Sequence, residues 1–101
     1  MTPRRAARVD NNQTEIVEAL RRMGATVQDL SPVGKGCPDI LVGFQGRNVL
    51  MEIKRPDGPK GGRAGRHLTT DQKLWHLRWR GQVCIVRTVD EAIQAACSRR
   101  G

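Results

Sequence analysis

The spacing of apolar residues near the N-terminus predicts a first helix. Four of them recur at the i, i+3, i+4, i+7 interval that places side chains on one buried helical face: Ile16, Ala19, Leu20 and Met23. Asn11 or Asn12 can cap the start of this helix, and Gly24 is a typical stop signal. We therefore expect a helix from about residue 11 to Met23.

Three strand-like stretches follow. A short one lies at 25–30, and two apolar runs at 39–44 and 48–54 are separated by three residues that include Gly46. Two such runs joined by a short glycine-containing gap are typical of an antiparallel hairpin. The segment 56–67 then contains four glycines, two prolines and three basic residues, so we expect a mobile basic loop there.

The last third of the chain begins with a helix and a strand. Thr69 and Gln72 form the sequence pattern of a capping box, which predicts a helix that runs to Arg80 and stops at Gly81. The continuous apolar run at 82–87 predicts a strand that is buried on both faces.

A second capping box, Thr88 with Glu91, opens a final helix that reaches about Cys97. The predicted order is helix, three strands, helix, strand, helix, which is typical of a mixed α/β fold. A chain of 101 residues has the length of one domain, so we expect a single domain over 1–101. Residues 1–9 carry three arginines without periodicity and are expected to form a flexible basic arm.

The amino-acid composition predicts the kind of partner that the protein binds and the compartment in which it works. Eighteen Lys and Arg against ten Asp and Glu give a net charge of +8, which favours a polyanionic partner such as nucleic acid. Three widely spaced cysteines without a CxxC pair argue against a disulfide framework or a zinc ribbon and for a reducing, cytoplasmic location. No apolar run approaches the ~18 residues of a membrane span, and the N-terminus lacks the apolar core of a signal peptide, so we expect no membrane association.

Two carboxylates interrupt the otherwise apolar hairpin. Strand alternation places Glu52 and Lys54 on the same face. If Gln45 and Gly46 form a two-residue turn, Asp39 lies opposite Glu52, where like charges repel across ~4.5–5.5 Å between Cβ atoms. A divalent cation would offset this repulsion, and oxygen-rich sites suit Mg²⁺ or Mn²⁺. The alternative is that Lys54 and nearby arginines neutralise the pair as a surface network.

A third carboxylate lies on the first helix. At ~100° per residue, Glu15 falls on the border of the apolar face, whereas Glu18 points to solvent. A helix packed on the sheet would therefore aim Glu15, not Glu18, along the sheet surface. The alternative is that Glu15 is simply a favourable acid in the first turn of a helix.

These residues resemble the PD-(D/E)XK nuclease superfamily. Pro38-Asp39, followed thirteen residues later by Glu52-Ile53-Lys54, matches its signature. The similarity is closer still to the small VRR-NUC family, including its stand-alone phage-type members, and it covers nearly the whole chain. Cys37 stands where such sequences often carry Val. The resemblance implies an α/β fold with a restriction-endonuclease-like core, a mixed sheet, and a bacterial or phage-infected cell as the setting.

The resemblance also implies a divalent-metal-dependent phosphodiesterase. Asp39 and Glu52, with the backbone carbonyl of Ile53, would hold Mg²⁺ or Mn²⁺. Lys54 would orient or activate the attacking water and offset charge on the phosphate, and Glu15 would assist the metal or its water. Such chemistry is sound, because a metal ion polarises the phosphoryl oxygen and a nearby cation stabilises the developing negative charge.

The helix after the basic loop contributes one further candidate. Gln72 matches a glutamine that VRR-NUC proteins place after the loop, where it would face the site as a catalytic residue. The alternative is that Gln72 only caps its helix. His76 shares a helical face with Gln72, and His67 precedes the helix, but solvated or structural histidines are commoner than catalytic ones.

The leading hypothesis is a metal-dependent DNA endonuclease whose substrate is branched DNA, such as a Holliday junction. Five basic residues are expected to bind the DNA: Lys35, Arg55, Lys60, Arg63 and Arg66. The alternative is a non-catalytic nucleic-acid-binding domain on the same scaffold, although a binder gains nothing from carboxylates on a DNA-facing surface. A small RNA-binding protein ranks third, because one Phe, two Trp and no Tyr leave few platforms for base stacking.

The helix after the basic loop also predicts a homodimer. Gln72, Trp75 and Trp79 share one face, and Leu74 and Leu77 lie on another. If the glutamine faces the site, the tryptophans pack on the sheet and the leucines face outward. We expect a second copy to cover the leucines in a two-fold dimer. The alternative is that a terminal segment folds over them.

Overall fold

The computed structural model describes residues 11–56 and 67–98. The basic arm expected at 1–9 lies outside this part of the chain. So does nearly all of the loop expected at 56–67, including Lys60, Arg63 and Arg66. None of the described helices is long and apolar enough to cross a lipid bilayer.

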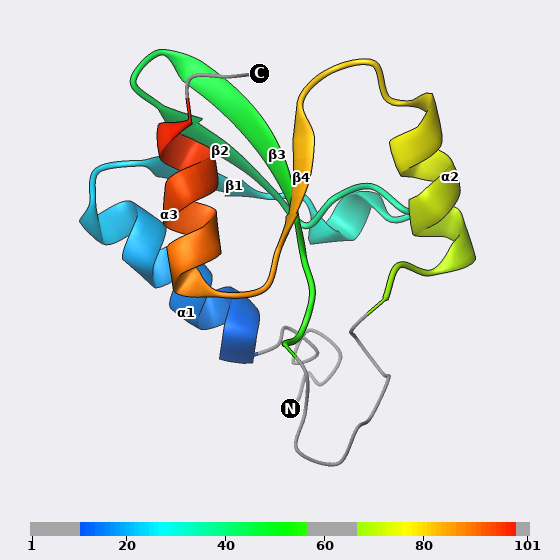
Figure 1. Cartoon of the computed structure of the whole chain (residues 1–101), viewed down its shortest axis with the longest axis horizontal. Coiled ribbons are helices and arrows are strands. Elements are labelled where there is room, and N and C mark those ends of the chain that lie inside the picture. The colour runs from blue at the N-terminus through cyan, green and yellow to red at the C-terminus, as the bar shows by residue number, and fades with distance from the viewer. Residues whose placement is uncertain (1–10, 57–66, 99–101) are drawn as a thin grey trace.

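Within the described residues, four strands form one mixed sheet: β1 (Thr26–Asp29), β2 (Ile40–Phe44), β3 (Arg47–Ile53) and β4 (Val83–Val86). The strands lie side by side in the order β1-β2-β3-β4 (Figure 1). β1, β2 and β3 are antiparallel neighbours, whereas β4 runs parallel to β3. A parallel neighbour requires a long crossover, which the connection through α2 supplies. The predicted mixed sheet and the predicted order of elements are both confirmed.

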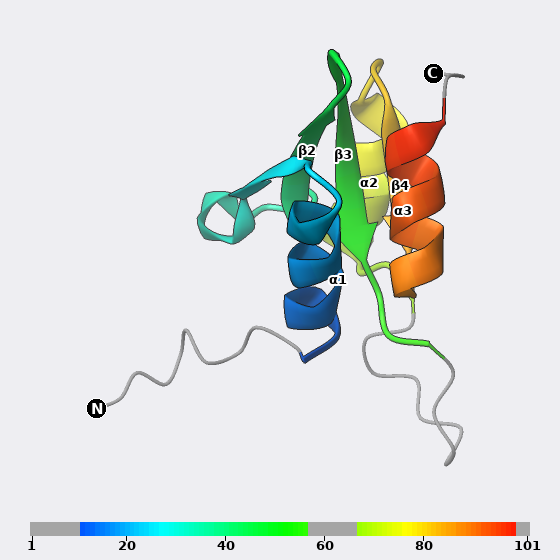
Figure 2. The ribbon, with the colours of Figure 1, turned by 90° about the vertical axis from the view of Figure 1, so that its left-hand side faces the viewer.

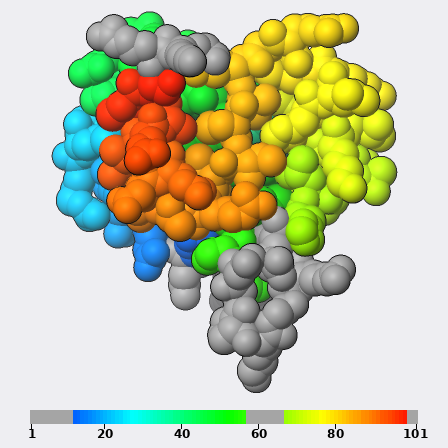
Figure 3. Space-filling model, viewed as in Figure 1, coloured from blue at the N-terminus to red at the C-terminus, as the bar shows by residue number. Residues whose placement is uncertain are grey.

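Helices lie on both sides of this sheet. α1 (Asn11–Arg22) and α3 (Val89–Cys97) pack against each other on one side, and α2 (Thr70–Arg78) stands on the other (Figures 1 and 2). A short 3₁₀ turn, η2 (Ser31–Val33), connects β1 to β2. In the space-filling view α2 forms the right-hand edge of the molecule (Figure 3). α2 is thus placed to contact the sheet face that α1 and α3 leave free.

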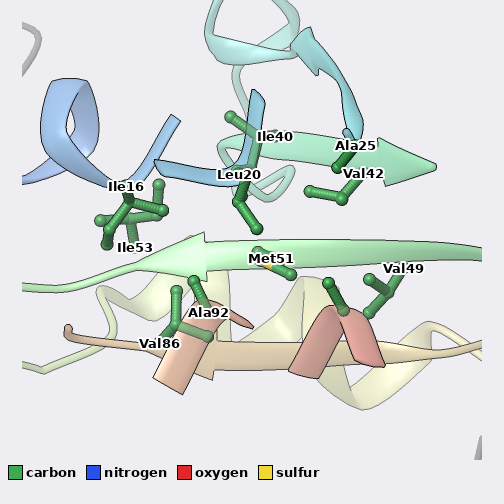
Figure 4. Packing of buried hydrophobic residues seen from close by; sticks show 11 residues of the cluster. Ile16, Leu20, Ala25, Ile40, Val42, Val49, Met51, Ile53, Val86 and Ala92 are labelled. Carbon is green, nitrogen blue, oxygen red and sulfur yellow. The ribbon is translucent and has the colours of Figure 1, made fainter. Parts of the chain in front are cut away.

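The hydrophobic core lies between the sheet and the layer of α1 and α3 (Figure 4). Three alternate residues of β3 are buried in it: Val49, Met51 and Ile53. Ile16 and Leu20 of α1 are fully buried against them, as the helical spacing predicted. Because successive strand residues point to opposite faces, Glu52 and Lys54 are directed toward the side that carries α2.

The β2–β3 turn fixes the register of the hairpin. Gln45 (φ 53°) and Gly46 (φ 79°) both have positive φ, as a type I′ turn requires. The pairing is the predicted one: Phe44 with Arg47 through Ile40 with Met51. Asp39 therefore enters β2 beside the last residues of β3, at the level of Glu52.

The helix starts agree with the sequence, apart from one side chain. At α2, Thr69 accepts a hydrogen bond from the backbone N–H of Gln72, and the Gln72 side chain accepts one from the backbone of Thr69. At α3, Thr88 accepts from the N–H of Glu91, but the Glu91 carboxylate accepts from Arg87 N, one residue before the cap (2.6 Å). The first capping box is confirmed. In the second, Thr88 caps the helix as predicted, but the Glu91 side chain binds the backbone of Arg87 instead of that of Thr88.

Three predictions about α2 and β4 are wrong. α2 ends at Arg78 instead of Arg80, because Trp79 has an extended backbone (ψ 131°). The tryptophans do not pack on the sheet: the Trp75 and Trp79 rings stack on each other, and no residue of α2 is buried. β4 is not buried on both faces, since only Val86 among its residues is fully covered. This strand lies at the sheet edge, and α3 packs against it.

Candidate active site

The hairpin brings Asp39 to the end of β3. Its backbone N–H donates to the carbonyl of Met51 (3.1 Å), and its carboxylate Oδ2 accepts from the backbone N–H of Ile53 (2.7 Å). Pro38, immediately before it, is fully buried and fixes the chain where it enters β2. Asp39 is therefore held against the backbone of the strand that carries Glu52.

Glu52 lies in the interior of this face, with a side chain that is 1% exposed. Its Oε2 accepts a hydrogen bond from Gln72 Nε2 (3.1 Å) and lies 3.9 Å from Lys54 Nζ. Its Oε1 is buried and has no hydrogen-bond partner within the described residues. A buried carboxylate oxygen without a partner is costly, which indicates that Glu52 is placed to receive a further positively charged or hydrogen-bonding group.

The protonation of Glu52 follows from these surroundings. Burial raises its pKa, the neighbouring carboxylate of Asp39 raises it further, and the ammonium of Lys54 lowers it, leaving a pKa of about 8. Without another cation, Glu52 thus keeps a proton at neutral pH. Lys54 alone does not compensate the two carboxylates, and both Glu52 and Lys54 are buried. The alternative of a surface charge network therefore does not describe this pair.

Gln72 has both of the roles that the sequence left as alternatives. Its side-chain oxygen accepts from Thr69 N (2.9 Å), which caps α2, and its side-chain N–H donates to Glu52. One amide group can do this because its oxygen accepts a hydrogen bond while its nitrogen donates one. The cap thus fixes the orientation of the group that touches the site.

Asn12 contributes a contact that the sequence reasoning missed. We expected it only as a candidate cap, but it lies inside α1, and its side-chain N–H donates to the carbonyl of Lys54 (2.9 Å) and to that of Arg87 (3.3 Å). It thereby attaches the first turn of α1 to the ends of β3 and β4. A signal was present, since Asn12 precedes Ile16 by one helical turn and so falls on the buried face.

Glu15 is exposed on α1, three residues after that anchor. Within the described residues, no hydrogen bond or ion pair joins it to Asp39, Glu52 or Lys54. Nor is there a group of three or more His, Cys, Asp or Glu placed to hold a metal ion in this part of the chain. The assisting role of Glu15 stays a prediction.

Two further side chains lie close to the carboxylates. The Nε2 of His76 is buried without a hydrogen-bond partner among the described residues, and burial together with the charge of Lys54 lowers the pKa of this ring. Burial raises the pKa of the Cys37 thiol, with smaller contributions from Glu52 and Asp39. His76 therefore adds no positive charge near pH 7, and Cys37 remains a thiol.

Two of the five basic residues expected to bind DNA lie in the described part. Lys35 and Arg55 are both exposed. Lys35 precedes the Gly36–Asp39 segment, and Arg55 follows Lys54 directly, so the two cations lie on either side of the carboxylate pair along the chain.

The residues present fit a divalent cation of the Mg²⁺ type. Mg²⁺ is typically held by one or two carboxylates, keeps several waters and binds substrate phosphates. Asp39 and Glu52 supply two carboxylates, and the unpartnered Glu52 Oε1 leaves one oxygen available. A cation there would replace the proton that Glu52 otherwise retains.

Fold and site together define the class of this chain: an α/β domain with a mixed sheet, in which half-buried Asp39 and the buried side chains of Glu52 and Lys54 cluster at the end of the central hairpin. Its structure is similar to a solved structure described as a VRR_NUC domain, with a TM-score of 0.60 and 24% sequence identity over 81% of this chain and 86% of the other. The fold is therefore that of a VRR_NUC domain, which confirms the resemblance at the level of the fold. No model of a known protein family matches the sequence, and no curated protein matches it.

Proposed function

We propose that this protein is a divalent-metal-dependent endonuclease that hydrolyses phosphodiester bonds in DNA. The observation that carries the proposal is the pairing of half-buried Asp39 with fully buried Glu52, where Lys54 alone does not compensate two ionised carboxylates. A protein that only binds DNA would have no use for this pair. The similarity to a VRR_NUC domain supports the same assignment.

Each candidate residue has a proposed role in this reaction. Asp39 and Glu52, with the backbone carbonyl of Ile53, would hold Mg²⁺ or Mn²⁺, which polarises the phosphate and lowers the pKa of a bound water. The Nζ of Lys54 lies 3.9 Å from Glu52 Oε2, which supports a role for Lys54 beside the metal: it would orient the attacking water and offset charge on the phosphate. Gln72 holds Glu52 Oε2 by a hydrogen bond. Glu15 would assist the metal or its water.

Branched DNA is the proposed substrate, and the net charge of +8 supports a polyanionic partner. Lys35 and Arg55, with Lys60, Arg63 and Arg66 of the basic loop, would bind the phosphates around the site. A homodimer would place two such sites on one junction. The cytoplasmic location expected from the cysteines remains part of the proposal.

Cleavage of labelled duplex, flap, fork and four-way-junction DNA in Mg²⁺, Mn²⁺ or EDTA tests this function. We expect cleavage with either metal and none in EDTA. Glu52→Gln removes one negative charge at nearly constant shape and should abolish cleavage, and Asp39→Asn and Lys54→Ala should do the same. Glu18→Gln, an exposed glutamate of α1, is the matched control and should cleave normally.

Two outcomes would overturn the proposal. Undiminished cleavage by a folded Glu52→Gln variant would show that this site does not carry out the reaction. Full activity in EDTA would show that the reaction does not need a metal ion. Tight DNA binding without cleavage in any metal would favour the non-catalytic binding domain instead.

A further inference from the structure

A groove opens between α2 and the loop after η2, next to the side of α2 that carries Gln72. Its volume is about 540 Å³, and its lining comes from the loop after η2 and from α2: Lys35, Asp71, Leu74, Trp75, Arg78 and Trp79. We call it the tryptophan groove, because it contains both tryptophans of the chain. Apart from Lys35, which the proposed function assigns to phosphate binding, these side chains have no role in the proposed cleavage reaction.

The two tryptophans form a single stack. The Trp75 and Trp79 rings lie 4.6 Å apart between centroids, with an angle of 18° between their planes. Trp79 is 44% exposed, so part of its side chain is open to solvent. Counting aromatic residues in the sequence led us to expect few stacking platforms, but the fold brings the two indole rings together into one. An exposed indole is a surface on which an unpaired base can stack with little dependence on its identity.

The charges of the groove match the backbone of a nucleic acid. Lys35 and Arg78 contribute two cations and Asp71 one anion, so the lining carries a net positive charge. Lys35 has a positive φ (57°) and lines the groove together with residues of α2. A nucleotide offers the complementary pair of features, an aromatic base and a phosphate, within one repeat unit.

The groove is continuous with the candidate active site. A Cβ at Gly36 would lie 2.3 Å from the backbone oxygen of Asp71, so the loop and the start of α2 are in direct backbone contact. Asp71 lines the groove, and the next residue, Gln72, contacts Glu52. The Trp75 ring also meets the His76 ring edge-on, with 5.8 Å between centroids. The groove and the carboxylates thus lie on adjacent sides of the same helix.

We propose that the tryptophan groove binds an unpaired nucleotide of single-stranded DNA, with the base stacked on Trp79 and the phosphates bound by Lys35 and Arg78. As far as it concerns a substrate, the inference rests on the proposed nuclease function. It narrows that function to DNA in which a single strand emerges beside the scissile phosphate, such as a flap or a fork. A fully paired four-way junction offers no such nucleotide.

Intrinsic fluorescence reports directly on this groove, since both tryptophans lie in it. The full-length protein is titrated in EDTA with short oligo(dT), the corresponding oligo(rU), a blunt duplex and a forked duplex. We expect saturable quenching by oligo(dT) and the fork at several-fold lower concentration than by the blunt duplex. Trp79→Ala should weaken oligo(dT) binding about tenfold, as expected from the loss of one stacked base, and Trp79→Phe should restore most of it.

The cations are tested by the salt dependence of binding. Lys35→Gln with Arg78→Gln should reduce the slope of log affinity against log salt concentration by roughly two phosphate contacts. Arg80→Gln is the matched control, because Arg80 is also exposed and basic but does not line the groove.

Several results would overturn the inference. If Trp79→Ala binds oligo(dT) as tightly as the wild type, the groove does not bind an unpaired nucleotide. The same conclusion follows if the blunt duplex quenches the fluorescence as well as the forked duplex does. Preference for oligo(rU) would assign the groove to RNA. The tryptophan emission should not change with protein concentration in the absence of DNA. If it does change, and Leu77→Glu removes that change, a second copy of the chain covers the groove.

The same measurements separate this inference from the nuclease proposal. Binding is read in EDTA, and Glu52→Gln should bind oligo(dT) as the wild type does whether or not it cleaves. If no DNA is cleaved but Trp79→Ala still loses its preference for oligo(dT), the groove stands and the proposed reaction fails. If cleavage depends on Glu52 but Trp79→Ala changes nothing, the reaction stands and the groove fails.

Discussion

Glu52 combines deep burial with a neighbour of the same charge. The side chain is 1% exposed, and the carboxylate of Asp39 is near enough to raise its pKa. Its pKa of about 8 lies above the value of 4.5 that it has when unfolded. The folded protein therefore holds more protons than the unfolded chain between these two values. This difference makes stability depend on pH in a direction that can be measured.

The metal-free protein should lose stability as pH rises from about 4.5 to about 8, because Glu52 must then ionise beside Asp39 with only Lys54 to compensate. Thermal melting in EDTA across this range, with Glu52→Gln alongside, isolates the effect. In a domain this small, ~1 kcal/mol moves the melting temperature by about 4–8 °C. Glu52→Gln should melt above the wild type at pH 8, and Mg²⁺ or Mn²⁺ should stabilise the wild type alone. Parallel pH curves for the two proteins would contradict the assigned pKa.

The two roles of Gln72 can be separated by one substitution. Glu also completes a capping box, so Gln72→Glu should keep α2 and its thermal stability. It replaces the N–H that Glu52 accepts with another carboxylate, and it should lower cleavage by about 10- to 100-fold, as is usual for partners of metal ligands. Circular dichroism and cleavage rates give the two readouts. Normal cleavage by Gln72→Glu would leave Gln72 with its capping role alone.

At the scale of elements, α2 is held mainly by its N-terminal turn. Its N-terminus is capped by Thr69 and meets the loop at Gly36, and the Gln72 side chain reaches β3. No residue of α2 is buried, so hydrophobic burial contributes little to its position. Small contacts at the start of the helix therefore determine where the site residues on it lie.

Gly36→Ala tests how α2 is positioned. Gly36 has φ +84°, and a Cβ there would lie 2.3 Å from the Asp71 carbonyl oxygen. Gly46→Ala is the matched control, since Gly46 has a similar φ of +79° and nothing within 4 Å of a Cβ. Both variants bear the ~1 kcal/mol cost of positive φ, but only Gly36→Ala should also lose cleavage. Equal effects on cleavage would mean that α2 is placed by other contacts.

The whole molecule leaves an apolar surface on α2. Leu77 is 77% exposed and Leu74 is 44% exposed. The leucines therefore face outward, as the sequence predicted, even though the tryptophans beside them do not pack on the sheet. Leu74 also lines the tryptophan groove, whereas Leu77 does not. Leu77 is thus the residue that tests the proposed dimer without altering the groove.

Light scattering at micromolar concentration should give the mass of a dimer, and Leu77→Glu should reduce it to that of a monomer. Val33→Glu is the control, because Val33 is also an exposed apolar residue (60%) but lies on η2. A monomeric wild type would rule the dimer out. It would then leave paired incision of a four-way junction without a geometric basis.

The sequence by itself determined the features that depend on near neighbours along the chain. The spacing from Ile16 to Met23 predicted α1 and its buried face, and the gap around Gly46 predicted the hairpin register that brings Asp39 to Glu52. The cap at Thr69 was equally readable. Each of these depends on backbone geometry within about one helical turn or one hairpin, which residue order specifies directly.

The tertiary structure decided the contacts between elements. Gln72 reaches Glu52 across 20 residues, and Asn12 reaches the Lys54 carbonyl across 42. The pKa of Glu52 depends on how deeply those contacts bury it. Sequence periodicity predicts which face of a helix is apolar, but not what that face contacts. Of the face that Gln72, Trp75 and Trp79 share, Gln72 contacts Glu52 on the sheet, whereas the two tryptophans stack on each other.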